Sequence, residues 1–375
     1  MRPATLPRLK LYINGRSLTH AITGVPRFAR CVITAMDDFL AEGGAPDIDA
    51  TVLVPRDAAV PPLRHMAIQT IGRRGGQLWE QVDLPSAAAG SVLLNLGNTA
   101  PARHRRNVVM IYDAVIWEHP SSYDWRFRAW YSALLPFIAR RALAVVSPSH
   151  FSANALAPRL GVPPGSIEVI PGGADHLLRL PPPSAAATSL SASLADRPFV
   201  LAVIGATRHK NAPAVRAAAA QLAPLGVTMV VVQTTWHAAR GAHISHGPNV
   251  RLVREVDDAT LRDLYTRAIC LFHPSRYEGF GLPPLEAMSL GCPVVASRAG
   301  SLPEVLGSAA LYGDPQDART FVDHIDRLLT NETECVALAT AGRERAGLYT
   351  WRRTAEALLD VARRCGDSTD GPRRR

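Results

Sequence analysis

The 375-residue chain has no long apolar run, no closely spaced pair of cysteines and only two lysines. A membrane-spanning helix needs about 18 or more apolar residues with few charges, and no stretch approaches that length. The five cysteines include no C-x-x-C pair, which argues against a zinc site and a disulfide framework. The first residues, where prolines and basic residues surround a short apolar run, differ from a signal peptide. We therefore expect a cytoplasmic protein with buried free thiols.

The positive charge is concentrated in the first half of the chain. Residues 1–180 carry 19 arginines and lysines against 13 acidic residues, within a net charge of +9 for the whole chain. Such a surplus can attract nucleic acid or an anionic membrane. Because no helix-turn-helix or aromatic-rich RNA-binding signature accompanies the charge, we expect no nucleic-acid partner and favour an anionic membrane surface. A basic surface that is merely solvated is the alternative.

Continuous apolar runs alternate with helical patterns in both halves, which predicts an open α/β sheet in each half. Helical patterns cover 26–40 and 125–142, and a last helix is expected near 351–364. Proline-, alanine- and serine-rich sequence at 181–198 predicts a linker between two domains. The predicted strands are 9–13, 51–54, 92–96, 108–112 and 143–147 in the first half, and 199–206, 227–232, 250–253, 269–273 and 294–297 in the second.

The segment FHPSRYEGFGLPPLEAMSLGCPVVAS, residues 272–297, combines two buried strands with a glycine turn and a helix between them. Such a unit directs backbone N–H groups and the positive end of a helix dipole at one place beyond the strand ends, which suits an anionic ligand. Glu278 in the turn and Glu286 in the helix can accept hydrogen bonds from sugar hydroxyls. A single glycine or acid would also fit an ordinary core helix, so the indication comes from the whole ordered string.

The E-x7-E pattern within EGFGLPPLEAM, followed by GCPVVAS and LPEVLG, resembles the donor-site signature of retaining family-four glycosyltransferases. The resemblance extends over nearly the whole chain. It implies the α/β GT-B fold, in which two Rossmann-like, doubly wound domains face a central cleft. Residues 1–180 would bind the acceptor, 199–350 the nucleotide-sugar donor, and a helix at 351–365 would cross back to the first domain. Residues 366–375 are expected to be disordered.

The resemblance also assigns donor-side residues. In ATRHKNAP, Lys210 has the place of a lysine that faces the nucleotide diphosphate, whereas Ala206 stands where an arginine is usual and Arg208 is the candidate substitute. In a chain so rich in arginine, a retained lysine suggests a site that needs a compact point charge. The expected donor-binding residues are Gly24, Arg208, Lys210, Gly279, Phe280, Gly281, Leu282 and Glu286.

On the acceptor side, VVMIYDAVIWEHP resembles the family segment in which a His-Asp pair ends a strand beneath the sugar. Asp113 keeps the acid and is expected to be catalytic together with Glu278. Tyr112 replaces the histidine, so Tyr112 and His119 are the acceptor-side candidates. His150 is a further histidine that could take over this role.

The resemblance implies a metal-independent, retaining hexosyltransferase whose nucleotide-sugar donor is a substrate, with no separate cofactor. The strings INGRSLTHAITGVPRFAR and NLGNTAP resemble mannosyltransferases of surface-polysaccharide assembly, which favours mannose from GDP-mannose. The acceptor would be a lipid-linked saccharide in bacterial exopolysaccharide or O-antigen synthesis, reached by peripheral binding to the inner face of the membrane. A GT-B nucleotide-sugar epimerase or phosphorylase, or an inactive sugar-nucleotide-binding protein, are the alternatives.

Overall fold

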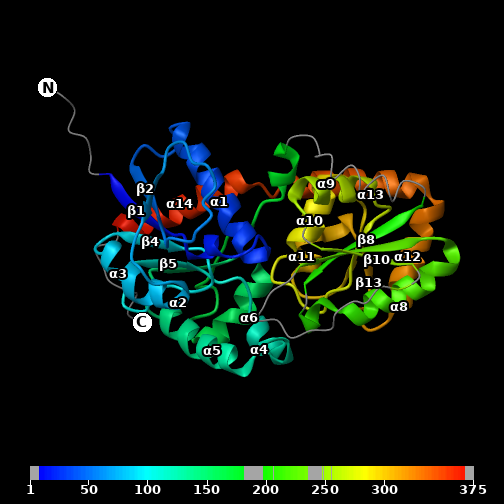
Figure 1. The fold of residues 1–375 in the computed structure, drawn as a ribbon, viewed down its shortest axis with the longest axis horizontal. Helices are drawn as coiled ribbons and strands as arrows, with labels where there is room; N and C mark the ends of the chain where they lie inside the picture. Colours follow the sequence, from blue (N-terminus) through cyan, green and yellow to red (C-terminus); the bar gives the residue numbers. More distant parts are fainter. Residues whose placement is uncertain are drawn as a thin grey trace. The chain divides into compact units, whose positions relative to one another are not determined.

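The computed structural model describes residues 8–180, 197–205, 207–234, 247, 249–254 and 256–367. The chain forms two compact units (Figure 1). Unit 1 comprises Met1–Ala114, Trp130–Gly172 and Trp351–Arg375, and unit 2 comprises Val115–Ala129 and Gly173–Thr350. Most of the predicted linker, Ala206 and the last eight residues lie outside the described residues. In the part of the chain that is described, no helix combines the length and apolar character needed to cross a membrane.

Unit 1 contains a parallel seven-stranded sheet in the order β3-β2-β1-β4-β5-β6-β7. β1 lies between β2 and β4, with Leu11 opposite both Ala50 and Val92. The strands are β1 (Leu9–Asn14), β2 (Ile48–Val54), β3 (Ala67–Thr70), β4 (Val92–Asn95), β5 (Asn107–Met110), β6 (Ala144–Ser147) and β7 (Glu168–Val169). The five predicted strands are confirmed, although β5 ends at Met110, which leaves Tyr112 beyond the strand.

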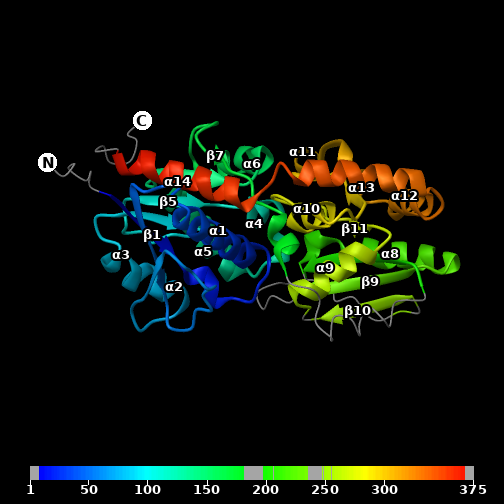
Figure 2. The same cartoon turned by 90° about the horizontal axis from the view of Figure 1, so that it is seen from above.

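Helices cover the sheet of unit 1. The first, α1 (Gly24–Ala41), has a buried stripe at Phe28, Val32, Met36 and Leu40, the i, i+4 spacing of an amphipathic helix. The last, α14 (Trp351–Asp367), packs against α1, β1, β4 and β5, as Figure 2 shows. The others are α2 (Gly76–Leu78), α3 (Leu84–Ala87) and α6 (His150–Leu160), together with α5 (Trp125–Ala139), whose first five residues belong to unit 2.

Unit 2 contains a parallel six-stranded sheet in the order β10-β9-β8-β11-β12-β13. The strands are β8 (Phe199–Gly205), β9 (Thr228–Thr234), β10 (Val250–Arg254), β11 (Leu271–His273), β12 (Val294–Ser297) and β13 (Leu311–Gly313). The helices are α4 (Val115–Glu118), α8 (Ala212–Leu222), α9 (Asp258–Arg267), α10 (Leu282–Ser289), α11 (Leu302–Leu306), α12 (Ala318–Thr330) and α13 (Glu332–Ala346).

Both faces of the second sheet are buried. Leu201 and Val203 of β8 belong to a core shared with α9, α10 and α11, whereas Val200 and Ala202 belong to a second core shared with α8 and α12. This two-sided burial explains why β8 is continuously apolar in sequence. Two doubly wound parallel sheets confirm the predicted α/β fold class.

In each sheet the strand order reverses once, between β1 and β4 in unit 1 and between β8 and β11 in unit 2. Open α/β sheets bind their ligands beyond the carboxyl ends of the strands at such a switch point. We therefore expect functional residues in the chain segments that follow these four strands.

We predict that Trp351→Ala destabilises unit 1. Trp351 is buried and its ring lies edge-on to that of Phe28, with a centroid distance of 5.1 Å, so truncation would open a cavity between α14 and α1. Such cavities cost about 3 to 5 kcal/mol of unfolding free energy. Urea denaturation measures the loss of unfolding free energy. The control variant Trp125→Ala, at an exposed tryptophan, should change stability by less than about 0.5 kcal/mol. Equal losses in the two variants would contradict the packing role.

Candidate functional site

Two loops meet at the switch point of unit 2. The loop after β8 contains the short 3-10 turn Arg208–Lys210, and the loop after β11 runs over 274–281. The backbone N–H of Arg276 donates to the carbonyl of His209 at 2.8 Å. Asn211, with a left-handed φ of 59°, donates from Nδ2 to the carbonyl of Pro274 at 3.0 Å. This conformation is uncommon for a residue other than glycine, and the hydrogen bonds hold it in place.

An ion pair joins the two loops. Lys210 Nζ lies 2.7 Å from Glu278 Oε1, and the same oxygen accepts a hydrogen bond from His273 Nε2 at 2.8 Å. Burial would raise the pKa of Glu278, whose exposed fraction is 7%, but the charge of Lys210 and the interaction with His273 outweigh it and hold the pKa well below its usual range. The site therefore presents an ionised carboxylate beside an ammonium group.

The backbone of Glu278 is also fixed. Its carbonyl accepts hydrogen bonds from the N–H and the hydroxyl of Ser301, both at 3.0 Å. Gly300 has a φ of +61°, and a Cβ atom there would lie only 2.6 Å from the Glu278 carbonyl oxygen. The close approach therefore requires glycine at position 300.

The glycine turn leads into α10 as the sequence predicts. Gly281 has a φ of 94° and precedes Leu282, and Pro283 and Pro284 occupy the first turn, where their missing N–H groups cost nothing. Gly279 is buried, and Leu282 packs partly buried against the core. The Phe280 ring packs edge-on against Tyr349, so this side chain serves the core of unit 2.

Glu286 lies on the second turn of α10 and is 2% exposed. Its Oε2 accepts a hydrogen bond from the Tyr265 hydroxyl at 3.1 Å, and its Oε1 lies 3.3 Å from His176 Nε2. The two glutamates of the motif thus have different partners: a lysine and a histidine for Glu278, a tyrosine and a histidine for Glu286.

His209 lies between Arg208 and Lys210 and is buried, whereas Arg208 is exposed. Nδ1 of His209 lies 3.2 Å from the Ser122 hydroxyl, and Nε2 of His209 lies 3.2 Å from the Thr207 hydroxyl. Burial, followed by the charge of Lys210, lowers the pKa of His209 to about 3. This imidazole is therefore neutral at physiological pH, and its roles as donor and acceptor depend on the tautomer.

The segment Val115–Ala129 belongs to unit 2, although the sequence places it within the first 180 residues. The ring of His119 in this segment lies 5.3 Å from that of Tyr277 and 6.0 Å from that of His209. Burial lowers the pKa of His119, and the charge of Arg276 adds to that effect. Of the two acceptor-side candidates, His119 thus lies beside the loops that carry Lys210 and Glu278.

The other candidates lie in unit 1. The Tyr112 hydroxyl donates to the carbonyl of Leu96 at 2.9 Å, and burial raises the pKa of this phenol well above its usual value. Asp113 follows Tyr112 and is half-buried. Gly24 begins α1, where a Cβ atom would meet nothing within 4 Å.

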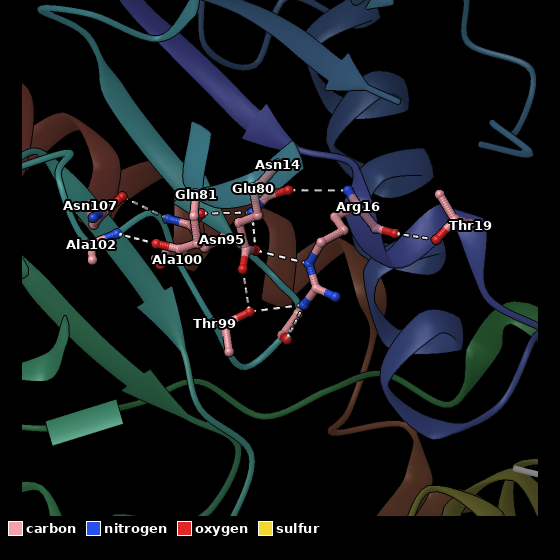
Figure 3. A network of polar contacts seen from close by, with 11 residues as sticks. Asn14, Arg16, Thr19, Glu80, Gln81, Asn95, Thr99, Ala100, Ala102 and Asn107 are labelled. Atoms are coloured by element: carbon pink, nitrogen blue, oxygen red, sulfur yellow. Dashed lines mark hydrogen bonds and ion pairs between the residues drawn. The ribbon is translucent and has the colours of Figure 1, made fainter. Parts of the chain in front are cut away.

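A buried polar network occupies the switch point of unit 1 (Figure 3). Arg16 Nε pairs with Glu80 Oε1 at 3.0 Å, and the same oxygen accepts from Asn14 Nδ2 at 2.8 Å. Thr99 donates to the other carboxylate oxygen at 2.6 Å. Glu80 lies on a π-helical turn, Trp79–Asp83, a distortion that often marks functional sites. The sequence assigns no role to Glu80, which lies in no recognised motif, or to His209, although His209 lies within the ATRHKNAP string.

Comparisons with known proteins agree with this geometry. A family model described as Glycosyl transferases group 1 matches residues 193–345, and one described as Glycosyltransferase Family 4 matches residues 40–176. Together the two models cover most of the chain. The chain is a family-four glycosyltransferase.

Curated relatives of this glycosyltransferase include mannosyltransferases. The O-antigen chain mannosyltransferase B of Escherichia coli is 42% identical over 112 residues, which is 30% of this chain and 29% of that protein. The MMP alpha-(1->4)-mannosyltransferase of Mycolicibacterium hassiacum is 36% identical over 132 residues, covering 31% and 32% of the two chains. The aligned regions thus span about a third or less of these relatives.

Solved structures show the GT-B fold over almost the whole glycosyltransferase chain. Sucrose-phosphate synthase from Thermosynechococcus elongatus superposes with a TM-score of 0.72 at 20% identity, covering 95% of this chain and 99% of that one. WaaG, described as a glycosyltransferase involved in lipopolysaccharide biosynthesis, superposes with a TM-score of 0.66 at 12% identity, covering 94% and 99% of the two chains.

Within the described residues of the glycosyltransferase, no three His, Cys, Asp or Glu side chains gather as a metal site.

We predict that His209→Gln makes the stability of this glycosyltransferase less sensitive to acid. Folded His209 stays neutral down to about pH 3, whereas the unfolded chain binds a proton below about pH 6.5. Unfolding therefore takes up a proton between these values, and stability falls as the pH falls. His209 should lower the free energy of unfolding by about 2 kcal/mol between pH 7 and pH 5.

Urea denaturation at the two pH values tests this prediction. The groups that face His209, namely Lys210, Glu278 and His119, are present in both proteins, so the difference between wild type and variant isolates the imidazole. His65→Gln, at an exposed histidine, serves as the control. The same acid sensitivity in His209→Gln and wild type would contradict the prediction.

Proposed function

We propose that this chain transfers a hexose from a nucleotide sugar to a saccharide acceptor. The observation that carries the proposal is the cluster of Lys210, Glu278 and His273 at the switch point of unit 2. An ammonium group at this place can bind diphosphate oxygens, and an ionised carboxylate can accept hydrogen bonds from sugar hydroxyls. Arg208, Gly279, Gly281 and the start of α10 at Leu282 would complete the donor site.

The proposed reaction retains the configuration of the anomeric carbon and needs neither a metal ion nor a separate cofactor. The bond from the anomeric carbon to the diphosphate oxygen breaks, and a bond to the acceptor oxygen forms on the same face. The proton of the acceptor hydroxyl passes to the departing diphosphate. Lys210 and the N-terminus of α10 offset the charge of the leaving group, and Glu278 stabilises positive charge that develops on the sugar.

The donor that we propose is GDP-mannose, from which mannose is transferred. The proposed acceptor is a lipid-linked saccharide in O-antigen or exopolysaccharide synthesis. Both mannosyltransferase relatives support mannose as the transferred sugar, and the O-antigen chain mannosyltransferase supports the choice of acceptor. On the acceptor side, Asp113 is the residue that we propose to be catalytic. His119 is preferred to Tyr112, because the Tyr112 hydroxyl is bonded to a main-chain carbonyl. Gly24 would let the start of α1 approach the diphosphate.

The test is an assay of the purified protein with GDP-mannose and other nucleotide sugars, after a thermal-shift panel has identified those that bind. A ligand at about 100 times its dissociation constant stabilises by about 2.7 kcal/mol. Mannose should appear on a lipid-linked saccharide acceptor. Conversion of the donor without acceptor would favour an epimerase, and dependence on free phosphate a phosphorylase. Binding without any turnover would favour an inactive binding protein.

Lys210→Ala is predicted to weaken nucleotide-sugar binding far more than binding of the free nucleoside. The ammonium group acts on the phosphates and on the charge of the leaving group, which the nucleoside lacks. Isothermal titration with both ligands measures the difference. Equal losses of affinity for the two ligands would indicate that Lys210 serves only to hold Glu278. The variant Arg319→Gln, at an exposed arginine of α12, controls for the change in net charge.

The two glutamates of the motif are predicted to differ in kinetics. Glu278→Gln should chiefly lower kcat, because its carboxylate faces charge that develops on the sugar, whereas Glu286→Gln should chiefly raise KM for the donor through a ribose contact. A loss of about 2 to 3 kcal/mol at the transition state lowers the rate roughly 30- to 150-fold. The opposite assignment, or full kcat in Glu278→Gln, would reject these roles.

Because Glu278 is buried and paired, its substitution also endangers the fold. Circular dichroism and thermal unfolding of each variant therefore accompany the kinetics. The double variant Lys210→Met with Glu278→Gln separates the two effects. If the single losses of stability arise from the broken pair, the double variant recovers part of the stability and none of the rate.

A further inference from the structure

Helix α5 carries large apolar side chains on two opposite sides. Its inner side is buried at Leu134, Leu135, Ile138 and Ala139. Its outer side is formed by residues spaced four and three apart, which lie on one face of a helix. We call this side the α5 outer face; it consists of Arg126, Trp130, Ala133, Phe137 and the adjoining Arg140, all exposed.

The α5 outer face exposes unusually large aromatic side chains. Trp130 and Phe137 are 46% and 43% exposed, and Trp125, at the start of the helix, is 65% exposed. Large apolar side chains of a helix normally face the core. The residues of the α5 outer face are all exposed, so this face lies toward solvent along the helix that Figure 1 labels α5. Aromatic residues gathered in this way indicate a contact with another apolar surface.

The charges beside these aromatic residues have one sign. Residues 125–142 contain four arginines and no acidic residue. Among the described residues, no carboxylate forms an ion pair with Arg126 or Arg140. The guanidinium group of Arg126 lies 5.4 Å from the centre of the Trp125 ring, and that of Arg141 lies 4.9 Å from the centre of the Phe137 ring. The partner surface should therefore be apolar and carry negative charge.

We propose that the α5 outer face docks the protein on an anionic lipid bilayer. Tryptophan and phenylalanine rings enter the boundary between headgroups and acyl chains, while arginines extend along the apolar stem to reach lipid phosphates. Arg126 and Arg140 at the two ends of the face, with Trp130 and Phe137 between them, satisfy both requirements. Residues 1–180 carry 19 basic against 13 acidic side chains, and the four arginines of 125–142 are among these 19, so the surplus includes the charges of α5.

An anionic bilayer fits these observations better than a second copy of the chain. A second copy would bring the same arginines to the contact, and the whole chain has a net charge of +9. Two α5 outer faces would therefore repel each other, whereas phosphatidylserine headgroups would be attracted. Docking goes beyond the proposed sugar transfer and requires neither donor nor acceptor, so it can be tested independently of catalysis.

The test is sedimentation with vesicles of phosphatidylcholine alone and of phosphatidylcholine mixed with phosphatidylserine. We expect binding to the anionic vesicles, weakening as salt rises, and little binding to neutral ones. The variant Trp130→Ala with Phe137→Ala should bind at least about tenfold more weakly. The variant Arg126→Gln with Arg140→Gln should bind roughly 25-fold more weakly, or about fivefold for each arginine.

Two control variants remove matched groups from unit 2. Leu178→Ala with Val336→Ala removes exposed apolar side chains, and Arg216→Gln with Arg319→Gln removes exposed arginines. Both should bind the anionic vesicles within about twofold of wild type if α5 is the docking surface. Unchanged thermal unfolding of all four variants would exclude loss of fold.

Three outcomes would overturn the proposal. The first is equal binding to neutral and anionic vesicles, or to neither. The second is a loss in the control variants that equals the loss in the α5 variants. The third is a dimer, detected by analytical ultracentrifugation without lipid, that the aromatic variant abolishes, since this would assign the α5 outer face to a second copy of the chain.

Discussion

The ion pair between Lys210 and Glu278 is the interaction on which the site in unit 2 depends. A buried carboxylate is tolerated only when charge and hydrogen bonds compensate for its lost hydration, and here Lys210 and His273 do so. Because Lys210 follows β8 and Glu278 follows β11, the pair also fixes two loops at the point where the strand order reverses. A constraint of this kind limits the conformations of the two loops, which reduces the entropy that ligand binding must overcome.

Each unit places a strained asparagine beside its switch point. In the described residues, only Asn98 and Asn211 combine a positive φ with a side chain, at 67° and 59°. Asn98 follows β4 and accepts a hydrogen bond from the N–H of Tyr112, and Asn211 follows the turn after β8 and donates to Pro274. In both cases an amide links the segments after neighbouring strands. The hydrogen bond offsets a backbone strain of about 1 to 3 kcal/mol, so the loop has one conformation.

The sequence predicts those features that depend on local pattern. Strand Val294–Ser297 was predicted with its observed bounds, and the glycine turn before α10 follows from its φ-permissive glycine. By contrast, β3, β7 and β13 escaped prediction, because β3 is exposed and the other two have only two and three residues. The partners of Glu278 could not be predicted either, since Lys210 lies 68 residues away and only the folded sheet brings them together. Glu80 was missed for the same reason, because its partner Arg16 is 64 residues distant.

The two cations of these networks, Arg16 and Lys210, differ in how many of their N–H donors the protein itself uses. Arg16 directs Nε to Glu80 and Nη2 to Thr99, so its planar donors are directed at the protein itself. The ammonium group of Lys210 has three donors, and Glu278 is its only hydrogen-bond partner among the described residues. With a side chain that is 22% exposed, Lys210 can keep its bond to Glu278 and still bind a phosphate oxygen. Lysine at this position therefore forms a structural contact through one N–H donor, and its other donors suit the diphosphate contact that we propose, whereas the donors of arginine form a fixed planar fork.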